Sequence, residues 1–166
     1  MGKAVSKPAV VNDTTQASQV SDATLHGLVG YQVKRASDMV LANLKQTLRP
    51  FDLRMLTHTA LVLIVDNPGL RQSQLADAMD IERPNLVVII DELERRALIN
   101  RDRVPTDRRA YALNPTLAGR RLYDKAVEAV KTHDARLLQG VDEPTRAIVM
   151  EAMQQIRKNA GRREKT

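Results

Sequence analysis

Apolar positions with helical spacing occur twice in quick succession in the middle of the chain. The first group consists of Leu75, Ala76 and Met79, and the second runs along one face as Leu86, Ile89, Ile90, Leu93 and Ala97. Only residues 80–82 separate the two patterns. A connection this short is typical of a helix-turn-helix, so the pattern predicts that motif over residues 70–97.

The pattern then changes from helical spacing to two short stretches that favour strands, residues 98–101 and 110–113. Between them lies the turn-prone, positively charged segment 105–109. A helix, a turn, a second helix and a basic hairpin in this order predict a winged helix. The fold class expected is mainly α with a small β-hairpin wing.

Longer helical patterns flank this region. An apolar stripe from Leu25 to Leu48 covers about 24 residues, or about 36 Å of helix, and ends near Pro50. A second helix stops at residues 67–69 and is expected at the buried centre of the domain, with its inward side formed by Leu56, Ala60, Leu63 and Ile64. After the hairpin, Thr116 is expected to cap a helix that reaches about Gly140, and Asp142 to begin the last one.

These flanking helices carry more apolar surface than a small winged-helix domain can cover. The simplest arrangement is a two-fold homodimer in which they interleave; an intramolecular bundle in a monomer is the alternative. The expected organisation is a flexible arm (1–21), an N-terminal dimerisation helix (22–50), a winged helix-turn-helix (51–115), C-terminal dimerisation helices (116–160) and a basic tail (161–166).

Composition narrows the class of protein. Among 166 residues, 26 Lys and Arg face 20 Asp and Glu, for a net charge of +6, which suits a polyanionic partner but also simple solubility. The chain has no cysteine, which excludes disulfides, thiolate metal sites and cysteine-based redox sensing. With no long apolar run and no leader pattern, we expect a cytoplasmic protein without a membrane partner.

Several short motifs, in their order and spacing, resemble the MarR family of bacterial transcription regulators. They are Gln74-Leu75-Ala76, Pro84-Asn85, the run Asp91 to Ile99, Asp107-Arg108-Arg109 and the run Thr116 to Arg120, with a looser match at Leu48 to Leu53. The resemblance covers residues 25–158. It implies a homodimeric winged-helix regulator, most simply a repressor, that binds double-stranded DNA.

The candidate DNA contacts of the helix-turn-helix follow from its faces. With the apolar stripe turned inward, the second helix presents Asn85, which can pair with an adenine edge or a phosphate, and two valines suited to thymine methyl groups. An alternative is that both valines pack on the preceding helix. The candidates are Arg71, Ser73, Gln74, Arg83, Pro84, Asn85, Val87 and Val88, of which Arg71, Ser73, Gln74 and Arg83 are placed to contact the phosphate backbone.

In the hairpin, the resemblance implies that one arginine enters the minor groove while the other pairs with Asp107 to stiffen the loop. We expect Arg108 in the groove and Arg109 on Asp107, although the sequence leaves the assignment open. Arg101 and Arg103 on the flanking strand are expected to contact phosphates. A charged hairpin that only keeps a strand edge soluble is the alternative.

Enzyme chemistry is not expected. His26, His58 and His133 are isolated from other metal-ligating side chains, and the chain contains no phosphate-binding glycine loop or nucleophile elbow. We therefore predict no catalytic residues, no cofactor and no metal.

The resemblance also implies a small-molecule effector, such as an aromatic carboxylate or its thioester, held between the dimerisation helices and the winged helix. The candidate ligand residues are Tyr31, Arg35, Met39, Thr57 and His58. Arg35 can alternatively form a surface or dimer salt bridge, and His58 a hydrogen-bonded core contact. The predicted function is a ligand-responsive repressor; the alternative is a non-specific DNA-binding or protein-interaction dimer without an effector.

Overall fold

The computed structural model describes residues 21–104 and 107–161, without the side chains of residues 104–110. The chain divides into two compact units, Met1–Ser37 and Asp38–Thr166. None of the helices in the described residues is both long enough and apolar enough to cross a membrane.

The N-terminal unit is helical but not as one continuous helix. α1 (Ala23–His26) ends before α2 (Val29–Leu48) begins, and the N–H of Leu28 donates to the carbonyl of Leu25 in a tight turn. The single helix expected from Leu25 onward is therefore wrong at this point. Gly27 lies in the break, and glycine is a weak helix former because its backbone loses the most freedom on folding.

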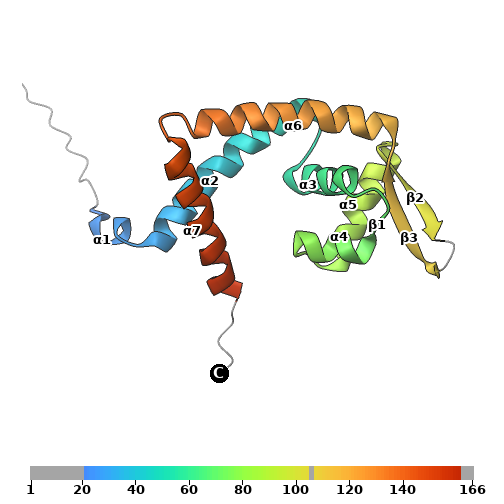
Figure 1. Ribbon diagram of the computed structural model, residues 1–166, viewed down its shortest axis with the longest axis horizontal. Coiled ribbons are helices and arrows are strands. Elements are labelled where there is room, and N and C mark those ends of the chain that lie inside the picture. The colour runs from blue at the N-terminus through green and yellow to red at the C-terminus, as the bar shows by residue number, and fades with distance from the viewer. Residues whose placement is uncertain (1–20, 105–106, 162–166) are drawn as a thin grey trace, which may run out of the picture. The chain divides into compact units, whose positions relative to one another are not determined.

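The second unit contains the winged helix-turn-helix, which confirms the predicted fold class (Figure 1). Its elements are α3 (Met55–Asp66), β1 (Leu70–Arg71), α4 (Gln72–Met79), α5 (Arg83–Arg95), β2 (Ile99–Val104) and β3 (Asp107–Pro115). The strands form an antiparallel sheet in the order β1-β3-β2, with Leu70 opposite Leu113. The sequence prediction missed β1, because two residues are too few to show an alternating pattern.

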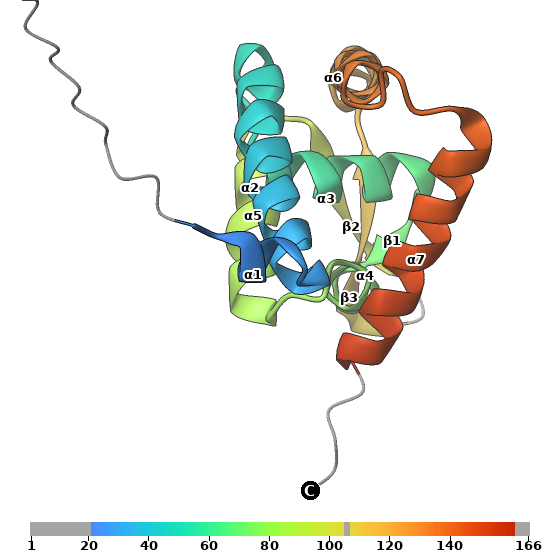
Figure 2. The ribbon, with the colours of Figure 1, turned by 90° about the vertical axis from the view of Figure 1, so that its left-hand side faces the viewer.

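The core of this unit lies between α3, α5 and the sheet. α3 contacts α4, α5, α6 and β3, and Figure 2 shows it running through the middle of these elements. From α5, Leu86, Ile89, Ile90 and Leu93 are all buried, as predicted. Each such side chain contributes about 1.5–3 kcal/mol by leaving water.

The predicted apolar faces are wrong at two positions, Leu56 and Ala97. Leu56 of α3 is 43% exposed, and Leu61 is fully buried in its place. Ala97 lies beyond the end of α5, exposed and with a left-handed backbone (φ 54°), so it does not extend the helical stripe. The left-handed turn redirects the chain from α5 into β2, which a helical pattern alone does not reveal.

The long C-terminal helices begin where their caps were predicted. The Thr116 hydroxyl accepts from the N–H of Gly119 (3.0 Å) at the start of α6 (Leu117–Leu137). Asp142 accepts from the N–H of Thr145 (3.0 Å) at the start of α7 (Glu143–Gly161). α7 has no buried residue, and its exposed apolar side chains are Ile148, Val149, Met150, Met153 and Ile156.

A smaller apolar cluster joins α6 to the segment before α3. Leu48 and Leu53, before and after the short 3-10 helix η1 (Arg49–Phe51), are buried there together with Ala126 of α6. This cluster fixes the end of α2 and the start of α3 against α6, and the cationic pocket described below lies over the same segment.

We predict that Gly119→Ala destabilises the protein by about 1–3 kcal/mol. A Cβ at Gly119 would lie 3.0 Å from the carbonyl carbon of Leu98 and closer still to its oxygen, so α6 would have to shift away from β2. Urea unfolding monitored by circular dichroism measures the loss. Gly161→Ala, where nothing lies within 4 Å of the added methyl, is the control and should change stability by less than about 0.5 kcal/mol. Equal stability of the two variants would contradict the packing described here.

Candidate nucleic-acid interface and adjoining pocket

The outer face of α5 carries the candidate base-reading residues. Arg83, Pro84 and Asn85 in its first turn are exposed. Val87 is 43% and Val88 62% exposed, which speaks against the alternative that the preceding helix covers both. Two bare β-branched side chains beside an exposed amide form an apolar, weakly hydrogen-bonding reading face.

The start of α4 has a different local chemistry from the one expected. The Gln74 side chain accepts a hydrogen bond from the N–H of Arg71 (2.9 Å), so Gln74 closes the first turn of its own helix. Arg71 and Ser73 are exposed beside it. This bond uses only the amide oxygen of Gln74, so Arg71, Ser73 and Gln74 all stay predicted phosphate contacts at this end of α4.

The hairpin is tied to α5 through Arg101. Its guanidinium pairs with Asp91 and, at 2.9 Å, with Glu94, and its side chain is only 22% exposed. Arg103, two residues further along β2, is exposed. Arg101 thus holds the wing against the recognition helix, while Arg103 is free of those carboxylates.

The tip of the wing lies partly outside the described residues. Asp107 pairs with Val104 in the strand register, and Arg108 and Arg109 follow it in β3. The side chains of Asp107, Arg108 and Arg109 are outside the described part of the chain, so their roles stay predictions.

A second group of ion pairs fixes the inner flank of α5. Glu92, 17% exposed, pairs with Arg54 at 2.5 Å and with Arg96 at 3.7 Å. Arg96 also donates to the carbonyls of Asp52 (2.5 Å) and Phe51 (3.1 Å). Glu92 thus connects the recognition helix to the chain between α2 and α3.

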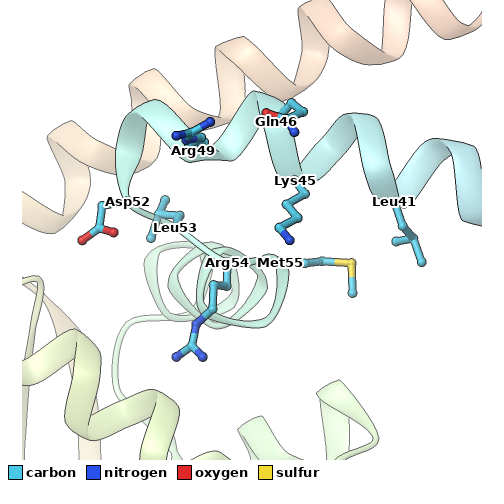
Figure 3. A pocket seen from close by; sticks show the side chains of 8 residues that line it. All are labelled: Leu41, Lys45, Gln46, Arg49, Asp52, Leu53, Arg54 and Met55. Atoms are coloured by element: carbon cyan, nitrogen blue, oxygen red, sulfur yellow. The ribbon is translucent and has the colours of Figure 1, made fainter.

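A cationic pocket opens on the other side of this junction. It has a volume of about 710 Å³ and is lined by Leu41, Lys45, Gln46, Arg49, Asp52, Leu53, Arg54 and Met55. Figure 3 shows Lys45 extending from α2 toward the start of α3, where Arg54 and Met55 lie. Three cations and three large apolar side chains against one carboxylate make this a site for an amphipathic anion.

The predicted ligand residues do not line this pocket. Tyr31 and Arg35 contact each other in the N-terminal unit, through a 3.1 Å hydrogen bond and a cation over the ring. Met39 is 65% exposed. Thr57 is buried and borders a smaller pocket of about 430 Å³ beside Asn85 and Val88.

Lys45, Arg49 and Arg54 were missed by sequence reasoning, although the first two are four residues apart and share a helical face. Arg54 follows Pro50, and nothing in the sequence shows that the turn through η1 brings it back to the same pocket. Among the described residues, no cluster of three His, Asp or Glu is placed to hold a metal ion.

His58 on α3 is half-buried, and its Nε2 is buried with no hydrogen-bond partner in the described part of the chain. It does not line the cationic pocket. Desolvation by burial lowers the pKa of its imidazole from the ordinary value of 6.5, because the charged form is poorly solvated there.

Comparisons with known proteins agree with this architecture. The family model described as "MarR family" matches residues 53–111. A curated relative from Thauera aromatica, named as a transcriptional regulatory protein for the hcr operon, is 31% identical over 135 residues, covering 81% of this chain and 79% of its own.

Two solved structures are similar over most of the chain. The transcriptional repressor CouR bound to a 23-mer DNA duplex is 33% identical, covers 84% of this chain and 99% of its own, and has a TM-score of 0.80. CouR from Rhodococcus jostii RHA1 bound to p-coumaroyl-CoA is 31% identical, covers 82% and 95%, and has a TM-score of 0.74. CouR is named as a transcriptional repressor.

The chain is a winged helix-turn-helix transcriptional regulator. This follows from the exposed outer face of α5, the hairpin that Arg101 holds against it, and these relatives. The chain belongs to the MarR family, which confirms the resemblance found in the sequence.

We predict that replacing His58 with glutamine reduces the loss of stability in mild acid. Below about pH 6.5 the unfolded chain binds a proton that the buried imidazole resists, so the stabilisation present above that pH is lost as the pH falls. Urea unfolding of wild type and His58→Gln from about pH 8 to about pH 5.5 measures the difference. The same slope in both proteins would show that His58 does not contribute to it.

Proposed function

We propose that this chain is a homodimeric repressor that binds a pseudo-palindromic operator and releases it when an aromatic acyl-CoA thioester binds. The observation that carries the proposal is the cationic pocket, whose Arg54 reaches the recognition helix through Glu92. The existence of solved complexes of the related CouR with a DNA duplex and with p-coumaroyl-CoA supports both halves of it.

In the proposed complex the two subunits place their α5 helices in successive major grooves, with half-sites about 10 bp apart. Asn85 contacts an adenine edge or a phosphate, and Val87 and Val88 pack on thymine methyl groups, which favours an A·T-rich half-site. Arg71, Ser73, Arg83 and Arg103 contact phosphates. In the wing, Arg108 enters the minor groove while Arg109 pairs with Asp107.

The dimer interface in this proposal uses the apolar faces that the described residues leave bare. In the N-terminal unit, Leu25, Leu28 and Val29 are 44–65% exposed. On α7, Ile148 and Met150 are 66% and 58% exposed. A monomer with these faces in water would be prone to association, and a second copy of the chain covers them by symmetry.

The pocket suits a CoA thioester in charge and in size. A CoA moiety carries a pyrophosphate and a further phosphate, and Lys45, Arg49 and Arg54 supply cations for them. Leu41, Leu53 and Met55 offer an apolar surface to the acyl group. The volume of about 710 Å³ lies within the range of small-molecule sites, roughly 300–1,000 Å³.

Selection of bound duplexes from a random pool is expected to return an A·T-rich inverted repeat. On that duplex, Arg108→Ala should weaken binding by about 1–3 kcal/mol, and Val88→Ala should relax the preference at one position in each half-site. Fluorescence anisotropy at fixed salt measures both. Arg157→Ala on α7 is the matched charge control and should bind like wild type. If no repeat emerges, the protein is a non-specific DNA-binding or protein-interaction dimer instead.

Binding of p-coumaroyl-CoA to the free dimer is expected by isothermal titration calorimetry, with free p-coumarate binding far more weakly because it lacks the phosphates. Arg49→Gln should weaken the thioester by about tenfold, the cost of one charged hydrogen bond. Arg120→Gln, an exposed arginine on α6 outside the pocket, should leave the affinity unchanged. Equal affinities for free acid and thioester would contradict the proposed role of the phosphates.

A further inference from the structure

We propose that Arg54 is the exchangeable link between effector and operator: its guanidinium pairs with Glu92 of the recognition helix in the DNA-binding state and with the anionic effector in the released state. The inference rests on the proposed function, and it names the residue through which the pocket acts on α5.

Arg54 belongs to both sites at once. It lines the cationic pocket, and its Nη2 lies 2.5 Å from Oε2 of Glu92, 38 residues away in the sequence. It also borders the smaller pocket beside Asn85 and Val88, on the DNA-reading side of α5. Of the residues that line the cationic pocket, Arg54 pairs with a carboxylate inside α5, while Asp52 pairs at 3.9 Å with Arg96, which follows the last turn of that helix.

The two arginines on Glu92 differ in how firmly they are held. The Arg96 side chain is 20% exposed and donates to two backbone carbonyls at the end of η1, so it is part of the fold. The Arg54 side chain is 74% exposed, and Glu92 is its one ion pair within the described residues. An exposed ion pair is weak because water solvates the separated cation well.

Exchange of Arg54 therefore leaves no buried charge without a partner. Glu92 keeps Arg96 at 3.7 Å, and Arg54 gains an effector phosphate, which can accept at least as many charged hydrogen bonds as a carboxylate. The exchange breaks the ion pair between Glu92 of α5 and Arg54, the residue that precedes α3. A ligand can shift the dimer away from its DNA-binding arrangement only through such a difference in contacts between the two states.

Linkage makes this proposal measurable. If the effector competes with Glu92 for Arg54, removing the charge of Glu92 removes the competition. Glu92→Gln should then bind the effector several-fold more tightly in the absence of DNA, and the effector should weaken its operator binding less than it weakens that of wild type.

The experiment measures operator affinity of the full-length dimer with and without saturating p-coumaroyl-CoA, using the selected duplex. The ratio of the two affinities is expected to be about 5–150-fold for wild type and below about 3-fold for Glu92→Gln. Glu94→Gln is the matched control: it removes the same charge from the same helix, but Glu94 pairs with Arg101, so the ratio should equal that of wild type.

The effector affinity of Glu92→Gln separates a specific effect from a loosened fold, because a damaged pocket would bind more weakly rather than more tightly. A wild-type ratio in Glu92→Gln, or weaker effector binding by it, would overturn the exchange of Arg54 while leaving the effector itself established. If wild type binds no p-coumaroyl-CoA in calorimetry, the proposed effector class fails first, and the exchange fails with it.

Discussion

The structure depends on one constraint: α5 has to bury one face in the core and leave the opposite face exposed to solvent. Leu86, Ile89, Ile90 and Leu93 are at most 5% exposed and anchor the helix to the core, while Val87 and Val88, between them in sequence, remain in water. Because a helix repeats every 3.6 residues, seating one stripe fixes the direction of all other side chains. The position of the reading face is thus set by hydrophobic burial on the opposite side of the same helix.

Burial sets how α5 is rotated, and ion pairs connect it to its neighbours. Its three acidic side chains after Ile90 all pair with arginines: Asp91 and Glu94 pair with Arg101 of β2, and Glu92 pairs with Arg54 and with Arg96 at the end of the same helix. Arg54, Arg96 and Arg101 are therefore paired with acidic groups of α5, whereas Arg71, Arg83 and Arg103 of the same region are exposed. The net charge of +6 does not show which arginines are already engaged in such ion pairs.

The sequence predicted the elements well and the contacts between them poorly. Helical spacing, the short turn and the turn-prone hairpin located the winged helix, and Thr116 and Asp142 located the starts of the last two helices, because these signals are local. The pair between Arg54 and Glu92 spans 38 residues, and no local pattern encodes it. Leu56 and Leu61 are equally apolar, yet Leu56 is exposed and Leu61 is buried. Because α3 is packed on several sides, the spacing of its apolar residues does not show which of them face the core.

Arg101 has a wider consequence. Because it joins β2 to two carboxylates of α5, the wing and the recognition helix are tied directly to each other. In the proposed complex with DNA, this tie limits the distance between the groove contacts of the two elements, so an extra base pair inside a half-site would strain it. The distance between half-sites is set by the junction of two subunits instead. Related operators should therefore vary in the length of their central spacer and hardly at all within each arm.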